Sequence, residues 1–299
     1  MILILFMYMI LASTFTIGKA ALFYVQPIFF IGMRMLVAGG ILFTFLYIFR
    51  RHWLRFEKKH LYLFAQITFF HIYIAYVLEF IALQNISSAK ACLLYNLSPF
   101  ITALFSYLFF AEKLSTKKWV GLAIGFSGFL PTLIGCVPTE GPSILCISIP
   151  EILLLGSVVS SVQGWIVMKR LVRHEGYSPV LVNAVGMLSG GILALLTSLL
   201  FETGPLIYDK PDAVHMVILY GILAIIAANI IFYNLYGWLL HQYSATFLSF
   251  AGFTCPIFAA VYGWLFLHEV VSGSFFLSVG IIVIGLYLFY QEELIRVKN

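Results

Sequence analysis

The chain has 299 residues, of which 62% are hydrophobic and only 10% charged, with a formal net charge of +5. Soluble domains carry about 25% charged residues, so these values exclude a soluble globular protein. Mostly apolar runs of about eighteen residues or more recur along the chain, which is typical of membrane-spanning helices. The runs are apolar on all sides rather than alternating, which favours helices over barrel strands. We expect an all-α membrane protein.

The apolar runs predict ten transmembrane helices. The first run begins at Met1 without a positive segment before it or a small-residue cleavage site after it, so we expect a retained helix. Gly and Pro separate the runs, as at Pro27 and Pro179. The predicted helices cover residues 2–21, 27–49, 60–81, 88–110, 117–137, 149–169, 179–200, 214–238, 244–267 and 273–290.

Lys and Arg predict the orientation, because cytoplasmic loops collect positive charge. The segment "RRHWLRFEKKH" after the second helix carries five of them, and the loops after the fourth and sixth helices carry three each. The loop between the fifth and sixth helices has none. We therefore expect a protein of the cytoplasmic-type (bacterial inner) membrane with both termini in the cytoplasm.

One pattern occurs twice. In "SPFITALFSYLFFAEKLS" Pro99 precedes Glu112 by thirteen residues, and in "CPIFAAVYGWLFLHEVVS" Pro256 precedes Glu269 by the same number. The repeat predicts two five-helix halves, residues 1–137 and 149–291, joined by an external linker at 138–148. Because five is odd, the halves should be inverted, as in many secondary transporters whose substrate site lies near the membrane midplane.

Longer stretches carry a family resemblance. "STFTIGKAALF", "PIFFIGMRMLVAGG" with Arg34, "SSAKACLLYNLSPFITALFSYLFFAEKLS" and "WVGLAIGFSGFL" resemble the drug/metabolite transporter superfamily, EamA branch, and the resemblance extends over the whole chain. It implies alternating-access transport of small metabolites. The second half departs from the first at Gly186, which stands where Arg34 has its counterpart.

Charged residues inside the predicted helices are the first candidates for a substrate site. A charge in the bilayer costs from about 2.5 to more than 10 kcal/mol and marks a functional site by default. Arg34 lies roughly 10 Å deep at 1.5 Å per residue, and could grip a carboxylate through two hydrogen bonds. The alternative is a structural pair with Glu79. Lys19 and Lys90 lie nearer the helix ends, where their side chains could simply reach the interface.

Polar and aromatic side chains complete the candidate set. Tyr8 and Phe15 share a face of the first helix with Lys19, and His71 shares a stripe of the third helix with Glu79. His71 could couple transport to protons or could be a structural hydrogen-bonding residue. Asn96 is a candidate because Pro99, one turn later, frees a carbonyl at mid-helix, and irregular backbone at that depth should face a cavity or protein. Further candidates, some of which could instead bind helices together, are Gln163, Trp165, Asn229, Tyr233 and Tyr236.

Some residues are expected to be structural. Glu112 and Glu269 fall on opposite faces of an inverted repeat, so they should form corners, each facing the N-terminal end of the next helix behind a capping serine. Cys136 and Cys146 bracket the linker and could pair if that side is oxidising. Cys92 and Cys255 should be inert. The sequence shows no metal, cofactor, catalytic or nucleic-acid motif, so we expect no enzyme.

The leading hypothesis is a secondary transporter, monomer or homodimer, of a small carboxylate-bearing metabolite. Bases for a carboxylate, aromatics for a ring, and the resemblance together make S-adenosylmethionine, exchanged for S-adenosylhomocysteine, the most specific expectation. An amino-acid exporter of the same fold remains open. A drug-cation exporter fits less well, because it should place acids in the cavity. A non-transporting membrane assembly factor is the alternative from another class.

Overall fold

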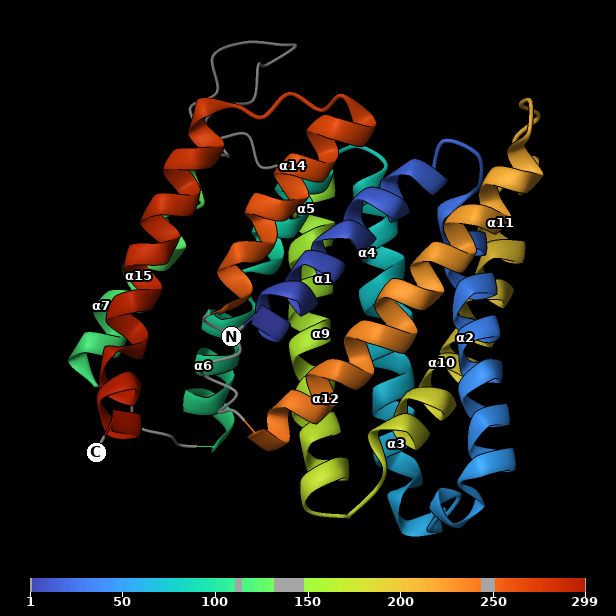
Figure 1. Ribbon diagram of the computed structural model, residues 1–299, viewed down its shortest axis with the longest axis horizontal. Helices are drawn as coiled ribbons and strands as arrows, with labels where there is room; N and C mark the ends of the chain where they lie inside the picture. The colour runs from blue at the N-terminus through green and yellow to red at the C-terminus, as the bar shows by residue number, and fades with distance from the viewer. Residues whose placement is uncertain (1, 111–114, 132–147, 243–250, 299) are drawn as a thin grey trace. The chain divides into compact units, whose positions relative to one another are not determined.

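A computed structural model describes residues 2–110, 115–131, 148–242 and 251–298. Nearly all of these residues are helical, and no named strand occurs among them beyond one isolated antiparallel bridge between Val25 and Ile207. The all-α prediction is therefore confirmed for the described part of the chain (Figure 1).

Among the described residues, six helical spans are long and apolar enough to cross a membrane. Four are single α-helices, namely α1 (Ile2–Ala21), α2 (Pro27–Phe49), α9 (Ile149–Arg173) and α10 (Pro179–Phe201). The bounds of α1 and α2 agree with the sequence prediction. The other two spans, Lys58–Leu83 and Ala213–Tyr236, are composite.

Each composite span contains a π-helix. The first span consists of η2 (Lys58–His60), α3 (Leu61–Gln66), the π-helix η3 (Ile67–Ile74) and α4 (Ala75–Leu83). The second consists of α11 (Ala213–Ala224), the π-helix η4 (Ile225–Phe232) and the start of α12 (Tyr233–Gln242). Sequence periodicity did not predict these wider turns, because it assumes a uniform α-helix.

Prolines interrupt two of the predicted helices. The span predicted at 88–110 divides into α5 (Ser88–Tyr95) and α6 (Ser98–Phe110), with a turn at Asn96 and Leu97. The break lies one turn before Pro99, which lacks the N–H that would bond the Tyr95 carbonyl, so the irregular backbone expected near Asn96 is present. A 3₁₀ turn, η5 (Gly252–Thr254), likewise precedes α14 (Cys255–Leu267) and Pro256.

The remaining helices are α7 (Thr116–Ser127), α15 (Gly273–Lys298) and the short η1 (Arg51–Trp53). Ser115 caps α7 by accepting a hydrogen bond from the Lys118 amide at 3.3 Å, as the sequence predicts. The predicted Cys136–Cys146 pair and Glu112 lie outside the described residues.

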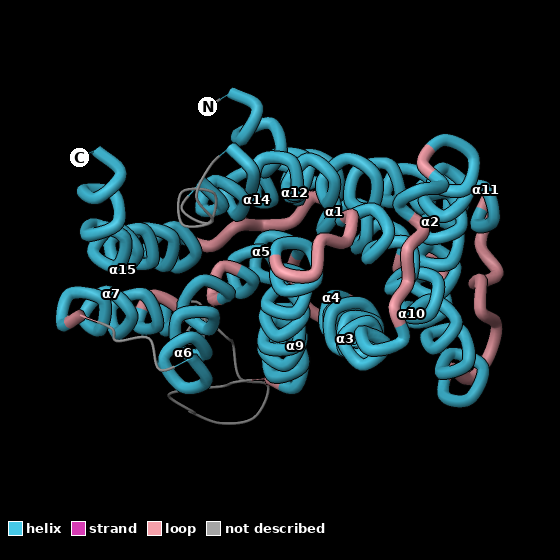
Figure 2. The backbone as a smooth tube through the Cα atoms, turned by 90° about the horizontal axis from the view of Figure 1, so that it is seen from below, coloured by secondary structure: helices cyan, strands magenta, loops and turns pink. Residues whose placement is uncertain are grey.

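The chain divides into two compact units, each built from both halves of the sequence. Unit 1 contains Met1–Thr16, Ile86–Ile152 and Trp238–Asn299, and unit 2 contains Ile17–Asn85 and Leu153–Gly237. Within unit 2, α2 and α10 pack along each other (Figures 1 and 2). Glycines permit the approach, since a Cβ at Gly39 or Gly191 would lie 2.7 Å from the backbone nitrogen of Leu188 or Leu36.

Within unit 1, α7 lies beside α15 and α5 lies beside α14 (Figures 1 and 2). A Cβ added to Gly121 or Gly285 would collide with the backbone of the facing helix, so α7 and α15 meet through small residues. The sulfur atoms of Cys92 and Cys255 lie 3.1 Å apart between α5 and α14.

In each unit a glutamate that follows one helix caps the beginning of another. In unit 2 the Glu202 carboxylate, just after α10, accepts hydrogen bonds from the amides of Ile28 and Phe29 at 2.7 and 2.9 Å. The carboxylate satisfies amides that have no partner within α2 and faces the positive end of its dipole. Burial and the nearby Glu202 charge raise the pKa of Tyr208.

In unit 1 Glu269 caps α5. Its carboxylate accepts hydrogen bonds from the Ser88 amide at 3.0 Å and the Ser88 hydroxyl at 2.6 Å. The expectation that Glu269 faces the helix after it, α15, was therefore wrong. His268 adopts a left-handed φ of 54° and turns the chain back, so Glu269 reaches a helix from the other half of the sequence.

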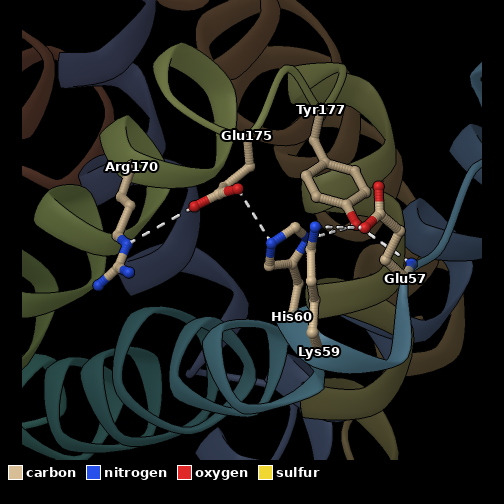
Figure 3. Close-up of polar contacts among 6 residues, drawn as sticks. All are labelled: Glu57, Lys59, His60, Arg170, Glu175 and Tyr177. Carbon is tan, nitrogen blue, oxygen red and sulfur yellow. Dashed lines mark hydrogen bonds and ion pairs between the residues drawn. The ribbon is translucent and has the colours of Figure 1, made fainter.

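A polar corner in unit 2 joins the start of α3 to the segment after α9 (Figure 3). His60 contacts the Glu175 carboxylate through Nε2 at 2.9 Å and the Tyr177 hydroxyl through Nδ1 at 2.8 Å. The Glu57 amide donates to the same hydroxyl at 3.1 Å. A hydrogen bond from Lys59 lowers the pKa of the Glu57 side chain. The polar side chains of this corner pair with one another, so we assign the corner a structural role.

Candidate substrate-binding site

The site in unit 2 is centred on Arg34 of α2. Its side chain is only 3% exposed, and the Nε and Nη2 atoms of its guanidinium group have no hydrogen-bonding partner. The guanidinium carbon lies 5.1 Å from the ring centroid of Tyr76 and 5.2 Å from that of Phe80. Cation–π contacts compensate part of the cost of burial. The two nitrogens leave a donor fork of the kind that binds a carboxylate.

Aromatic rings extend from Arg34 through unit 2. The hydroxyls of Tyr76 and Tyr233 are 2.6 Å apart and connect α4 to α12. The Tyr233 ring stacks on Trp165 of α9, with ring centroids 5.7 Å apart and planes 20° apart. Tyr236 contacts the same indole at 5.2 Å. This cluster offers flat apolar faces that could hold an aromatic ring or a ligand cation.

His71 belongs to the same cluster. Its ring meets Trp165 edge to face at 4.7 Å and Tyr233 at 5.9 Å. Neither ring nitrogen makes a well-formed hydrogen bond, although the backbone of Ser161 lies close enough for a weak one. Gly164 permits the approach of α9, because a Cβ there would collide with the His71 side chain. The His71 ring is therefore held by packing, and its nitrogens remain available for hydrogen bonds with a ligand.

Asn229 lies in the second π-helix of unit 2 and is fully buried. Its Nδ2 atom faces the thioether sulfurs of Met35 at 3.3 Å and Met187 at 3.6 Å, which are weak acceptors. Its Oδ1 atom has no hydrogen-bonding partner. A buried amide oxygen without a partner calls for an explanation, and an absent ligand is one.

The charged candidates near the helix ends have protein partners. Lys19 donates to the Leu83 carbonyl at 2.9 Å within unit 2. Glu79 is buried on α4. In unit 1, Lys90 forms an ion pair with the buried carboxylate of Glu151 at the start of α9. Glu151 also accepts a hydrogen bond from the Ser148 amide at 2.6 Å.

The other candidates of unit 1 gather around α1 and the turn before α6. Tyr8 packs against Gly252, where an added Cβ would lie 3.2 Å from the ring. Phe15 meets Tyr95 edge to face at 5.5 Å. Asn96 lies in the turn, and its Nδ2 atom has no hydrogen-bonding partner. Gln163 is half-buried on α9 in unit 2.

Sequence reasoning missed two residues that the structure places beside Arg34. The rings of Tyr76 and Phe80, both of α4, contact the Arg34 guanidinium. The α-helical spacing used for the third span selects Ala75 after His71. In the structure Tyr76, five positions after His71, reaches Tyr233. The sequence did contain a signal for this contact, because Tyr76 is a residue with a polar group between His71 and Glu79.

The groups gathered in unit 2 are suited to binding a small polar molecule. Unit 2 holds a cation with free donors, a buried amide, a buried imidazole and stacked aromatic faces. Among the described residues, no group of three or more His, Cys, Asp or Glu side chains could hold a metal ion. A membrane protein with such a buried polar centre has the features of a small-molecule transporter.

Comparisons with known proteins support this class. Residues 1–134 and 148–291 match the model of the EamA-like transporter family, so the chain belongs to that family. It is an integral membrane transporter rather than an enzyme. A solved crystal structure with 17% sequence identity covers 99% of this chain and 98% of its own, with a TM-score of 0.66, and shows the same fold.

Three bacterial relatives are similar to this chain over most of its length. The S-adenosylmethionine/S-adenosylhomocysteine transporter of Chlamydia muridarum is 36% identical over 94% of this chain and 88% of its own length. A protein of the same name from Chlamydia trachomatis is 35% identical over 94% and 86%. The uncharacterized transporter YoaV of Bacillus subtilis is 25% identical over 92% and 91%.

Proposed function

We propose that the protein exchanges S-adenosylmethionine for S-adenosylhomocysteine across a bacterial inner membrane. The observation that carries the proposal is the buried Arg34 guanidinium, which has two unpartnered nitrogens and lies beside an aromatic cluster. The names of the two Chlamydia relatives support the same substrates. Both substrates carry a carboxylate and an adenine ring, which are the groups that this chemistry recognises.

Each part of the substrate has a matching protein group. The Arg34 fork binds the carboxylate through charge-assisted hydrogen bonds. The rings of Trp165, Tyr233 and Tyr236 hold the adenine by stacking and stabilise the sulfonium of S-adenosylmethionine through cation–π attraction. Because S-adenosylhomocysteine differs at the sulfur and keeps both the carboxylate and the adenine, one site serves both directions of an exchange.

We infer that two inverted five-helix halves, residues 1–137 and 149–291, provide alternating access. Equal spacing of Pro99 to Glu112 and Pro256 to Glu269 supports this division. Helices that would be equivalent also pair in the structure, α2 with α10 and α7 with α15. Discontinuous helices in corresponding positions are a feature of inverted-repeat transporters.

The experiment is uptake of labelled S-adenosylmethionine into proteoliposomes that contain the purified protein and are loaded with S-adenosylhomocysteine. We expect uptake that depends on the internal S-adenosylhomocysteine and that external S-adenosylhomocysteine inhibits. An amino-acid panel serves as competitor. Strong competition by ordinary amino acids would favour the amino-acid exporter. No uptake of any panel member, by counterflow or under a proton gradient, would rule out the proposal.

A further inference from the structure

Two π-helices occupy corresponding places in the two halves of the sequence. The first covers Ile67–Ile74 and the second Ile225–Phe232, so each has eight residues and the starts are 158 residues apart. Each lies in the middle of a membrane-spanning segment, and both belong to unit 2. π-Helical turns are rare and occur frequently at functional sites. Two in matching positions indicate a shared task.

Each π-helix presents one buried and under-bonded polar side chain at its fifth residue. In the first this residue is His71, and in the second it is Asn229. Their exposures are 2% and 0%; neither ring nitrogen of His71 makes a well-formed hydrogen bond, and the Oδ1 atom of Asn229 has no hydrogen-bonding partner. Leaving a buried polar group unpaired costs about 1 to 3 kcal/mol, so two at equivalent positions are costly unless a ligand pairs with them.

Both residues connect to the groups assigned to the substrate. His71 contacts the Tyr233 ring, which begins the turn after Asn229. Asn229 contacts Met35, the residue next to Arg34. The Tyr76–Tyr233 hydroxyl bond joins the two π-containing spans beside the Arg34 guanidinium. His71 therefore lies in the aromatic cluster, and Asn229 lies against the residue that follows Arg34.

The orientation of Asn229 defines what it can accept. Its Nδ2 atom is turned toward two thioethers, which leaves Oδ1 as a free acceptor. A neutral acceptor among apolar groups suits a neutral donor, such as the exocyclic amino group of a purine. The amide oxygen alone can accept a hydrogen bond from that amino group. The neutral imidazole of His71 offers one donor and one acceptor, either of which suits a ring nitrogen or a hydroxyl.

We propose that the paired π-helices present the specificity-determining residues of the site, with Asn229 binding the 6-amino group of the purine and His71 binding a second polar atom of the nucleoside. This inference rests on the proposed function and adds the selection of an aminopurine. Arg34 holds the carboxylate, which all amino acids share. The π-helical pair distinguishes a nucleoside-bearing substrate from the rest.

The test compares S-adenosylhomocysteine with its 6-deamino analogue, in which hydrogen replaces the amino group, as inhibitors of labelled S-adenosylmethionine uptake in proteoliposomes. A site built to hydrogen-bond a substrate group discriminates against an analogue without it. We expect the natural protein to prefer S-adenosylhomocysteine by about tenfold or more. Asn229→Leu should bring this ratio close to one. His71→Leu should weaken both inhibitors by a similar factor, at least about fivefold, and keep the preference.

Asn183→Leu is the matched control, because Asn183 is an equally buried asparagine outside the π-helices, and the ratio should stay at the natural value. A natural protein that transports S-adenosylmethionine without preferring S-adenosylhomocysteine over the analogue would overturn the inference even if no variant folds. Asn229→Leu with the natural ratio, or His71→Leu with natural affinities, would overturn it as well. Absence of any S-adenosylmethionine transport would instead overturn the proposed function.

Discussion

At the scale of single residues, the guanidinium of Arg34 is buried and leaves Nε and Nη2 without a hydrogen-bonding partner, which makes it the strongest candidate for binding a substrate anion. Arg34 stood out because a buried guanidinium is costly. Its neighbours Tyr76 and Phe80 were not predicted, because aromatic residues are common in this chain and their direction depends on the packing of another helix. The type of each residue can be read from the sequence, whereas the contacts of its side chain depend on how the helices pack.

The geometry of Arg34 leads to a prediction about substitution. Arg34→Ala should abolish S-adenosylmethionine uptake and leave expression intact. Arg34→Lys keeps the charge but loses the planar donor fork, so uptake should fall by about 10- to 100-fold. The measurement is initial uptake rate at equal amounts of reconstituted protein. Arg55→Ala, at an exposed arginine of the same half, should transport normally. Natural uptake by Arg34→Ala would remove this residue from the site.

Lys90 leads to a different prediction, because it forms an ion pair with buried Glu151. Removing one member of a buried pair leaves an uncompensated charge and costs about 3 to 5 kcal/mol. Lys90→Met and Glu151→Gln should each lower the melting temperature of the detergent-purified protein. The double variant should be more stable than either single variant. Strictly additive losses in this double-mutant cycle would show that the pair contributes no coupling.

At the scale of helices, the lengths of the apolar runs predicted where helices occur. They did not predict the interruptions within those helices. Pro99 indicated an irregular backbone near Asn96, and the structure has a turn there. The π-helices could not be predicted from the sequence, because a wider turn depends on packing against neighbouring helices. The two π-helices nevertheless lie at corresponding places in the two halves of the sequence. This correspondence becomes visible only when the two halves are compared in the structure, because hydrophobic periodicity within one half does not reveal a π-helix.

The Glu269 cap is a contact between two helices that stability measurements can test. Its carboxylate accepts hydrogen bonds from the first residue of α5, and loss of such a cap typically costs about 1 kcal/mol or more. Glu269→Ala should lower the melting temperature by several degrees, and Ser88→Ala by less, because the Ser88 amide would still be capped. Asp209→Ala, at an exposed acid, is the control. An unchanged melting temperature for Glu269→Ala would contradict the assigned cap.

The cysteines of α5 and α14 offer a second test of the same interface. Cys92 and Cys255 have sulfur atoms 3.1 Å apart and are both buried. In a protein with Cys136→Ser and Cys146→Ser, a membrane-permeant oxidant such as copper phenanthroline should convert this pair to a disulfide. Peptide mass spectrometry detects the link, and Cys255→Ser is the control. Because both helices belong to one unit, we expect the linked protein to keep at least about half of its uptake.

At the scale of the whole molecule, composition predicted the membrane protein class and the helical fold, whereas the family was predicted from the resemblance of longer sequence stretches to known transporters. The division into units could not. Each unit combines segments from before and after the middle of the chain, where the predicted repeat would divide it. Helix pairs such as α2 with α10 contain corresponding members of each half. The predicted boundary between the halves is therefore not the boundary between the compact units, because helices from one half of the chain pack against helices from the other.

The last prediction concerns topology. Thirteen of the seventeen Lys and Arg residues fall on one face of a ten-helix arrangement, which favours both termini in the cytoplasm. The natural cysteines report on this, since the sequence places Cys136 and Cys146 near the external linker. After reduction, a membrane-impermeant maleimide added to intact cells should label these two. Cys92 and Cys255, which are buried, should stay unlabelled.

A cysteine introduced as Arg55→Cys supplies the matched position on the other face. It should react only after the membrane is opened, because the loop that contains it carries five Lys and Arg residues. A fluorescent protein fused to the C-terminus should mature, since it folds in the cytoplasm. Labelling of the Arg55→Cys protein in intact cells, together with protection of Cys136 and Cys146, would reverse the orientation. In that case the charge asymmetry would have to serve a purpose other than topology, such as binding anionic lipid headgroups on the outer face.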